Sequence, residues 1–591
     1  MDFKFILVAL NAKYIHSNLG LYSIRNYAKK HGVMVDIAEY TINHQLDDIL
    51  CGIYEQKPDV LAFSCYIWNI SMVRQVAEEY HKIDPDTPIW LGGPEVSFDA
   101  TEQLKKYPWC KGIMLGEGEE TATELARLYR DTKQVTDGEL ANIKGIAFSD
   151  GEAHITPARP LLPMDDIPFA YDNLEGLEHR IIYYETSRGC PFGCSYCLSS
   201  VDKQVRFRSM ELVEKELQFF LDNKVPQVKF VDRTFNCNKE HTMAIWKYIY
   251  EHDNKVTNFH FEIAADLLSD EEIAYIRQFR KGLIQLEIGV QSTNPKTIEA
   301  IRRKQDIHHL KNVVDKIHQP GNIHQHLDLI AGLPYEDIAS FAKSFDDVYH
   351  MKPDQLQLGF LKVLKGSPVY AESEKYNLVY KESAPYEVLY NQWISYKDVL
   401  RLKRVEEMVE TYYNSFQFQA TLQYLVGREK SPFAFYDGLA TFYKEGGMDK
   451  EKHSRNRYFE ILLEYACTGR EKMDETEYLH HKSMVKELLV FDLYSRENAK
   501  NRPEWAKEGV SRETRRQFYD DELLRRKYLP EYEAYKPAQV ASMTHFEHFT
   551  IDIPKFLSTG RMRDKEIDVI FDYGERNPLN HQARIVLVHE S

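Results

Sequence analysis

The chain has 591 residues, of which 43% are hydrophobic and 28% are charged. At roughly 100 to 200 residues per domain, this length predicts several domains and excludes a single small module. The hydrophobic fraction is enough to bury several cores, which excludes wholesale disorder. A formal net charge of −16 excludes a general electrostatic surface for nucleic acid or for an anionic membrane. No run reaches the roughly 18 apolar residues that cross a bilayer, and the apolar start lacks a basic leader pattern, so we expect a cytoplasmic protein without a membrane span.

The first 150 residues alternate between strand-like and helical patterns. We expect strands at 3–10, 33–40, 60–66, 88–92 and 112–115, with helices at 19–31, 45–56, 70–83, 99–106 and 119–131 between them. This alternation predicts βαβ units in a doubly wound parallel sheet, which binds ligands at the carboxyl ends of its strands. Small residues at three of these ends are candidate ligand contacts, the alternative being tight βα turns without a ligand. They are Ser64, Gly92, Gly93 and Gly116.

A proline-rich stretch at 157–168 predicts a linker, and a second alternating region follows it. Its expected strands are 181–187, 228–233, 259–264, 283–290, 324–330 and 355–363. Ser269 with Glu272 makes a predicted capping box, and Asn294 precedes a proline at a predicted first helical position. Six consecutive βα units predict a partial (β/α)6, TIM-like barrel with its active site at the carboxyl ends of the strands. From about residue 379 onward the pattern is mostly α-helical, with strands expected at 544–553, 566–571 and 583–588.

Three of the eight cysteines lie close together, in the run Cys190-Pro-Phe-Gly-Cys194-Ser-Tyr-Cys197. Thiolates at this spacing on one loop suit three irons of a four-iron cluster, and they leave the fourth iron open to a molecule that offers an amine and a carboxylate. The alternative is a zinc site, which needs a fourth ligand. Cys237 is a candidate for that ligand, but it lies at the end of a different predicted strand.

This cysteine motif, on the loop after the first strand of a βα array, resembles the radical S-adenosyl-L-methionine (SAM) superfamily. The resemblance implies that Cys190, Cys194 and Cys197 bind a 4Fe–4S cluster whose open iron holds SAM. It also implies that one-electron reduction cleaves SAM to methionine and a 5′-deoxyadenosyl radical.

The segments 286–292, 301–306 and 327–334 are similar to those of coproporphyrinogen-type radical enzymes. By that resemblance, SAM contacts are implied for Glu262, Gln291, Arg303 and Asp328. The chain departs from many relatives at Asp232, which stands where they carry a glycine-rich motif.

The order of the two regions resembles the cobalamin-binding (B12-binding) subclass, in which a Rossmann-like, flavodoxin-like domain holds the corrin and takes its nucleotide tail along the sheet edge. Ser64, Gly92, Gly93 and Gly116 would then line the path of that tail. Typical cobalamin domains carry Asp-x-His-x-x-Gly, whereas this chain has Tyr14-Ile-His16-Ser-Asn-Leu-Gly20. His16 is therefore either a lower ligand of cobalt or, as we expect, a loop or capping histidine.

These resemblances divide the chain into four parts. We expect a cobalamin-binding domain at 1–150, a linker at 151–178, a radical SAM barrel at 179–375 and a C-terminal domain at 376–591. The last part resembles an uncharacterised extension found on some cobalamin-type radical proteins, and it is a candidate substrate-binding domain.

We expect a cobalamin-dependent radical SAM methyltransferase that methylates an unactivated carbon of an unknown substrate, served by a reductant such as flavodoxin or ferredoxin. The first alternative is a cobalamin-dependent radical cyclase or rearrangement enzyme. An iron–sulfur and corrinoid-binding sensor or delivery module without turnover is the alternative of another class. Methylthiolation is disfavoured, because that family needs three further cluster cysteines and Cys51, Cys65 and Cys110 are not closely spaced.

Overall fold

The computed structural model describes residues 3–469, 473–506 and 509–588. The chain divides into two compact units. The first comprises Met1–Pro320, Gly332–Asp337 and Phe360–Ser395, and the second comprises Gly321–Ala331, Ile338–Gly359 and Tyr396–Ser591. Within the described ranges, no helix combines the length and the apolar character needed to cross a bilayer.

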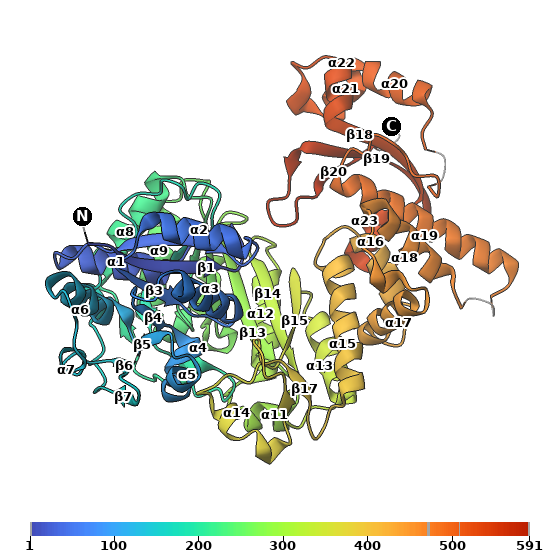
Figure 1. The fold of residues 1–591 in the computed structure, drawn as a ribbon. Helices are drawn as coiled ribbons and strands as arrows, with labels where there is room; N and C mark the ends of the chain where they lie inside the picture. Colours follow the sequence, from blue (N-terminus) through green and yellow to red (C-terminus); the bar gives the residue numbers. More distant parts are fainter. Residues whose placement is uncertain (1–2, 470–472, 507–508, 589–591) are drawn as a thin grey trace. The chain divides into compact units, whose positions relative to one another are not determined.

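A seven-stranded sheet begins the first unit, in the order β2-β1-β3-β4-β5-β6-β7 (Figure 1, blue to teal). Strands β1 to β5 are parallel, as the sequence predicts, and β6 and β7 extend the sheet in antiparallel pairs. The strands are β1 Phe5–Asn11, β2 Asp36–Thr41, β3 Val60–Ser64, β4 Ile89–Gly92, β5 Cys110–Met114, β6 Ile146–Ser149 and β7 Ala153–Ile155. The helices are α1 Leu19–Lys30, α2 Leu46–Gln56, α3 Ile70–Ile83, α4 Pro94–Ser97, α5 Ala100–Lys106, α6 Gly118–Asp131 and α7 Asp137–Leu140.

The central strand β1 shows why helices cover both faces of this sheet. All seven of its residues are buried. Ile6 and Val8 share one buried cluster with residues of α2, α3 and α5, whereas Phe5 and Leu7 share another with residues of α1 and α6. A strand that is apolar on both faces needs cover on both faces, which leaves the carboxyl edge of the sheet as the place for a ligand.

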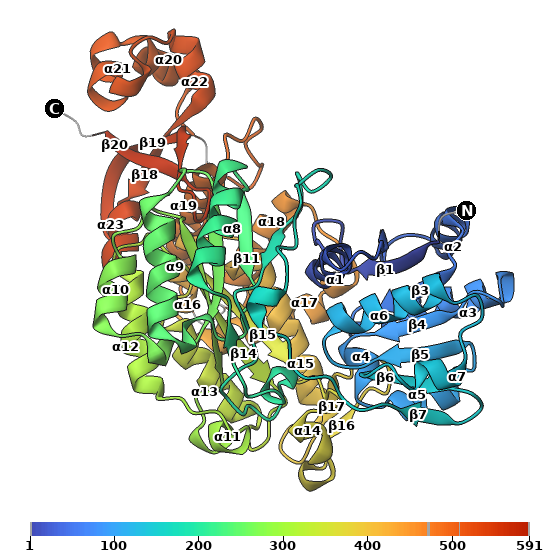
Figure 2. The ribbon, with the colours of Figure 1, turned by 90° about the vertical axis from the view of Figure 1, so that its left-hand side faces the viewer.

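Four parallel strands of the second region also belong to the first unit, in the order β8-β11-β12-β13. They are β8 Ile182–Tyr184, β11 Gln227–Phe230, β12 Asn258–Ile263 and β13 Ile284–Gln291. The helices are α8 Met210–Asp222, α9 Lys239–Glu251, α10 Asp270–Ile276, α11 Pro295–Ala300 and α12 Ile307–His318. Figure 2 shows α8, α9, α10 and α12 as a row along these strands. The predicted capping box of Ser269 with Glu272 and the predicted cap at Asn294 are both present.

Alternation along β12 separates an apolar face from a polar one. The Phe261 ring lies 6.3 Å from that of Trp246 in α9, so Phe261 faces the helices. His260 and Glu262 point the opposite way, because neighbouring side chains on a strand alternate between faces. In register with Glu262, Glu287 of β13 forms ion pairs of 3.0 Å with both Lys229 and His260. The strand face that points away from the helices is therefore charged.

The fifth and sixth predicted strands also exist, as β14 His324–Ala331 and β15 Gln355–Phe360, with α13 Ile338–Tyr349 between them. A short helix and a hairpin of two very short strands follow in the first unit: α14 Pro368–Ala371, β16 Val379–Tyr380 and β17 Val388–Tyr390. The hairpin lies where the sequence predicts helix. Strands of two or three residues are too short to carry the periodic signal that predicts a strand.

The C-terminal part of the second unit is mostly helical, as the sequence predicts. Its helices are α15 Tyr396–Met408, α16 Gln419–Val426, α17 Pro432–Glu445, α18 Arg455–Cys467, α19 Glu475–Arg496, α20 Arg512–Asp520, α21 Glu522–Tyr528, α22 Pro537–Met543 and α23 Ile553–Thr559. The three predicted strands are β18 Thr544–Ile551, β19 Asp564–Arg576 and β20 Ala583–Val588, which form an antiparallel sheet.

Candidate functional site

The three clustered cysteines lie on the loop that follows β9 (Ser187–Arg188). Gly189, at φ +94, turns the chain into this loop, and a Cβ there would collide with the carbonyl oxygen of Gln204. Only glycine fits such a position, because it adopts positive φ without strain and carries no Cβ. Within the loop, Cys190 and Cys194 are buried and Cys197 is partly exposed.

Electrostatic effects show that the thiols lie close to one another. Burial raises the pKa of the Cys194 thiol, Arg303 opposes that rise, and Cys197 and Cys190 add to it. Burial also raises the pKa of Cys237 to about 11, and Cys190 contributes to that rise. Buried thiolates need a positive partner, and iron or zinc, which thiolates bind well, supplies one.

One of the predicted SAM contacts, Arg303, lies beside Cys194, and a second, Gln291, lies beside the backbone that Arg303 bonds. The Nη1 group of Arg303 donates to the Tyr196 hydroxyl at 3.3 Å and lies 4.0 Å from Cys194 Sγ, while its Nη2 donates to the Gly289 carbonyl at 2.5 Å. Gln291 ends β13 with φ 69, and its buried Oε1 has no hydrogen-bond partner among the described residues. A Cβ at Gly289 would collide with the Gln291 Nε2 and lie 3.4 Å from the Arg303 Nη2, so both side chains end beside this backbone. The structure thus places a guanidinium next to Cys194 and an amide next to Gly289, whose carbonyl that guanidinium bonds.

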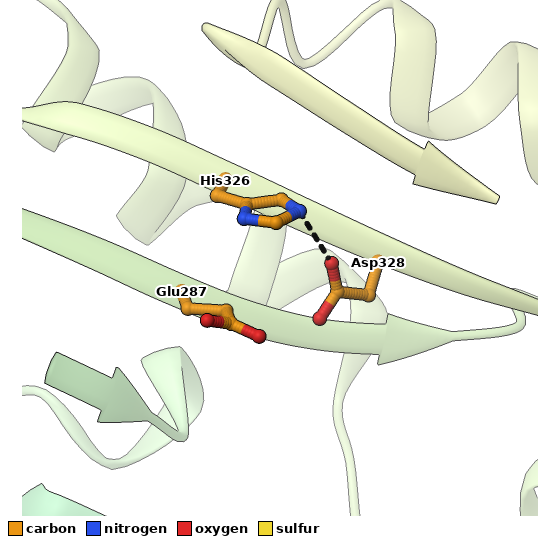
Figure 3. Close-up of side chains that lie close together, drawn as sticks. All are labelled: Glu287, His326 and Asp328. Carbon is orange, nitrogen blue, oxygen red and sulfur yellow. Dashed lines mark ion pairs between the residues drawn. The ribbon is translucent and has the colours of Figure 1, made fainter. Parts of the chain in front are cut away.

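The other two predicted contacts lie on strands of different units. Glu262 is partly exposed on β12 in the first unit. Asp328 lies on β14 in the second unit, where its carboxylate pairs with His326 at 2.9 Å (Figure 3). Figure 3 also draws Glu287, which belongs to β13 of the first unit.

Asp232, where the chain departs from its relatives, bonds the two residues at which the chain enters the cysteine loop. This carboxylate is fully buried and accepts hydrogen bonds from Thr186 N at 3.1 Å, Thr186 Oγ1 at 2.6 Å and Ser187 Oγ at 2.6 Å. Burial raises its pKa, and these three bonds oppose that rise. Its oxygens therefore serve the loop rather than a ligand.

A cavity of about 990 Å³ lies at the carboxyl edge of the N-terminal sheet. All four residues predicted from the strand ends line it, namely Ser64, Gly92, Gly93 and Gly116. Gly93, at φ +115, fits because a Cβ there would lie 2.5 Å from the Cys65 carbonyl oxygen. By contrast, a Cβ at Gly116 would meet no atom within 4 Å, so this backbone faces open space.

The same cavity is bounded by the cysteine loop's own flanks. Arg188 and Gly189 precede the first cysteine and line the cavity, as do Leu198 and Ser199, which follow the last one. His16 lines it as well, and its Nδ1 lies 2.7 Å from the hydroxyl of Tyr183 on β8. Burial lowers the pKa of His16, which keeps the ring neutral at pH 7. One cavity therefore adjoins both predicted cofactor sites.

The sequence-based prediction missed a group of charged residues between these two sites. Arg188 forms ion pairs with Glu117, Glu119 and Glu185. The glycines in the run from Gly116 to Glu119 predict a candidate ligand contact. No local sequence pattern predicts that the acids of this run pair with an arginine about seventy positions later. The only signal is that two acids stand at the start of a helix, which the helix dipole explains equally well.

Three family models match the chain in succession. The B12 binding domain matches residues 6–126, the Radical SAM superfamily matches residues 184–348, and the family described as a protein of unknown function (DUF4080) matches residues 374–571. The first two matches agree with the resemblances inferred from the sequence.

Relatives with described activities are distant. The chain is 23% identical over 439 residues to the anaerobic magnesium-protoporphyrin IX monomethyl ester cyclase of Rubrivivax gelatinosus, covering 68% of this chain and 73% of the cyclase. It is 26% identical over 356 residues to the cobalamin-dependent radical SAM methyltransferase TokK of Streptomyces tokunonensis, covering 54% of this chain and 50% of TokK. The match thus spans only half the length of that methyltransferase.

Solved structures share the fold. The cobalamin-dependent SAM radical enzyme OxsB with aqua-cobalamin bound gives a TM-score of 0.58 at 15% identity, over 83% of this chain and 80% of OxsB. The radical SAM methyltransferase TsrM of Kitasatospora setae, with cobalamin and an iron–sulfur cluster bound, gives 0.54 at 16% identity, over 65% of this chain and 76% of TsrM. The expected α/β fold class with parallel sheets is therefore confirmed.

Proposed function

We propose that this chain, which carries a B12-binding domain followed by a radical SAM domain, is a cobalamin-dependent radical SAM methyltransferase that acts on an unactivated carbon. The observation that carries the proposal is the single cavity of about 990 Å³. The carboxyl edge of the B12-binding domain forms one side of it, and the flanks of the cysteine loop form the other. Both sites therefore face the same cavity.

The cysteine loop suits an iron–sulfur cluster with SAM beside it. Cys190, Cys194 and Cys197 would hold the cluster, since soft thiolates are its usual ligands. Arg303 and Gln291 would hold SAM, because a guanidinium can form a fork with a carboxylate. The buried Oε1 of Gln291, which lacks a hydrogen-bond partner among the described residues, would accept a bond from the ligand. For Glu262 and Asp328, the same role stays a prediction from the resemblance.

The cavity suits cobalamin by size and by its lining. Ligand cavities usually measure roughly 300 to 1,000 Å³, so this one is at the size expected for a large cofactor. Ser64, Gly92, Gly93 and Gly116 offer a backbone edge that a nucleotide tail can approach closely. His16 stays a neutral side chain on the cavity wall, bonded to Tyr183, as the predicted loop histidine would be.

When bound, the cluster would supply the electron that turns SAM into a hydrogen-abstracting radical, and the corrinoid would supply the methyl group. The chain's own residues would orient and shield these groups. Arg303 fixes the loop by its bonds to Tyr196 and Gly289, and it places a positive charge beside Cys194. Electrons would come from a small reductant protein such as flavodoxin or ferredoxin.

A radical cyclase is the second candidate. The cyclase of Rubrivivax gelatinosus aligns with a larger share of this chain than TokK does, 68% against 54%. Methyltransferases nevertheless recur among the relatives, including the hopanoid C-3 methylase of Methylococcus capsulatus, which is 23% identical over 300 residues. That recurrence supports methyl transfer.

The test is anaerobic purification with cobalamin supplied, followed by iron counting, the visible spectrum of bound corrinoid and product analysis under a strong reductant. We expect about four irons per chain, one corrinoid, and both S-adenosylhomocysteine and 5′-deoxyadenosine as products. 5′-Deoxyadenosine without S-adenosylhomocysteine would favour the cyclase. Intact cluster and corrinoid without any SAM cleavage would favour a sensor or delivery module.

A further inference from the structure

An ion-pair network joins the cysteine loop to the carboxyl edge of the N-terminal sheet. Arg188, two positions before the first cysteine, directs three groups at three carboxylates: its Nη2 lies 2.5 Å from Glu119, its Nε 2.9 Å from Glu185 and its Nη1 3.3 Å from Glu117. Glu117 and Glu119 follow β5, whereas Glu185 follows β8. The side chains of Arg188 and Glu119 are only 17% and 4% exposed, so solvent screens their attraction weakly.

A second arginine lies on the two-stranded ribbon that leads into the cysteine loop. Its charge makes this ribbon depend on the ion-pair network. β9 pairs antiparallel with β10 (Arg206–Phe207), and this register sets Arg206 directly opposite Arg188. Like charges at facing positions destabilise a pair of strands. Glu117 offsets that repulsion, because its Oε1 lies 2.5 Å from Arg206 and 3.3 Å from Arg188. The ribbon that leads into the cysteine loop therefore depends on a carboxylate from the segment after β5.

That segment, residues 116–119, also forms part of the cavity wall. It is anchored independently of Arg188, since Glu119 accepts a hydrogen bond from Ser23 of α1 at 2.7 Å and Glu117 accepts one from the Leu162 N–H at 3.0 Å. The same four residues thus face the cavity on one side and hold the ribbon on the other. A shift between the ribbon and this segment would change the distance between the two sites without altering either site's own residues.

We propose that Arg188 is a positioning residue that fixes the cysteine loop against segment 116–119 and so sets the register between the two cofactor sites. This inference rests on the proposed function. A reaction that needs only the cluster site should survive the loss of Arg188, whereas one that spans both sites should slow. Cleavage of SAM to 5′-deoxyadenosine is of the first kind. Loss of the SAM methyl group to the reduced corrinoid, which breaks the S–CH₃ bond and leaves its electron pair on S-adenosylhomocysteine, is of the second kind.

The experiment compares R188Q and R188K with the wild type and with a matched control, R280Q. Arg280 also pairs with a carboxylate of the first unit, Asp253 at 2.9 Å. It is neither part of the cysteine loop nor one of the residues that line the cavity. Each protein is reconstituted anaerobically with iron, sulfide and cobalamin, then given SAM and a strong chemical reductant without substrate. Iron, corrinoid, 5′-deoxyadenosine and S-adenosylhomocysteine are quantified.

We expect R188Q to keep its iron and corrinoid and to form 5′-deoxyadenosine within about twofold of the wild type, while S-adenosylhomocysteine formation falls about tenfold or more. R188K should recover part of that rate, and R280Q should match the wild type. An unchanged product ratio in R188Q would overturn the proposal, and so would a loss of iron that lowers both products together. If the wild type itself forms no S-adenosylhomocysteine, the proposed function fails instead.

Hydrogen–deuterium exchange of the protein without cofactors gives a readout independent of activity. In R188Q, amides of 116–121 and of 187–194 should both exchange faster, because each segment loses its partner. Faster exchange in only one segment would refute the coupling.

Since R188Q leaves Glu119 buried without its arginine and could fail to fold, E117Q provides a second variant. It keeps the pair of Arg188 with Glu119 but removes the carboxylate between the facing arginines, so it should raise exchange in the ribbon and lower the product ratio in the same direction.

Discussion

A methyl group added at Gly116 tests whether the carboxyl edge of the N-terminal sheet touches a ligand. Gly116 and Gly32 have nearly the same backbone conformation, φ +76 and φ +72, and a Cβ at either position would meet no atom within 4 Å. Gly116 lines the cavity, whereas Gly32 follows α1 and is not among its lining residues. Substitution by alanine at the two positions therefore differs in one respect, which is whether the methyl group enters the cavity.

The expected magnitudes follow from these two situations. A residue other than glycine in the left-handed region costs about 1–2 kcal/mol, so Gly116→Ala and Gly32→Ala should lower the free energy of unfolding by similar amounts. A methyl group forced into a close contact costs a further ~1–3 kcal/mol in the complex. That penalty corresponds to a dissociation constant for cobalamin raised about 5- to 150-fold in Gly116→Ala alone.

The assay is titration of cobalamin into the cofactor-free proteins, with the quenching of tryptophan fluorescence as the signal, next to urea unfolding followed by circular dichroism. Wild-type affinity in Gly116→Ala would show that no ligand atom approaches this backbone. Equal weakening in both variants would show that backbone strain, rather than contact, controls binding. Either result refutes the assignment of the glycine edge to the corrinoid.

Three further outcomes are expected. Cys194→Ala should lose most of its iron and its 5′-deoxyadenosine formation, while Cys51→Ala, at an exposed cysteine of α2, should lose neither; iron retained in Cys194→Ala would contradict the cluster assignment. Asp232→Ala leaves the buried Thr186 N–H and the Ser187 hydroxyl without the partner that they have in the wild type, at about 1–3 kcal/mol for each buried group, so the cluster should dissociate faster on gel filtration, although Asp232 is not a predicted ligand. Burial raises the pKa of Asp492 to about 7, against about 3.9 in the unfolded chain, so the folded state binds this proton more tightly and stability should fall by up to about 4 kcal/mol as the pH rises from about 4 to 7. The free energy of unfolding of the wild type minus that of Asp492→Asn, measured with urea across that range, should show this fall, because the subtraction removes the contributions of the other titrating groups.

The backbone positions of the candidate site could be predicted because they depend on topology alone. In a parallel sheet the carboxyl ends of all strands meet at one edge, so locating the strand ends was enough to bring Ser64, Gly92 and Gly116 onto one wall. The cysteine loop follows in the same way from its place after β8. Long, strongly periodic elements make such reasoning safe, and their bounds differ from the prediction by only a few residues.

Short elements escaped the same reasoning. β6, β7 and the β16–β17 hairpin have between two and four residues each, too few for a period of two to be recognised. The proline-rich stretch, which the sequence predicts as a linker, also makes ion pairs that the sequence does not indicate: Arg159 pairs with Glu120 at 3.2 Å and also with Glu124. Composition indicates an extended backbone there, yet it does not determine whether the segment packs.

The ion pairs between the two sites are the feature that the sequence predicts least well. Glu117 and Glu119 at a helix start satisfy a local rule, and Arg188 before a glycine satisfies none, so no pattern within either segment requires the other. Their ion pairs span about seventy positions and join segments that follow strands of different sheets, where burial removes the water that would otherwise solvate each charge. A buried charge without its partner is costly, so each acid at this junction implies a base. The identity of that base follows from the three-dimensional packing of the two regions, which is also why Arg188 reports on the register between them.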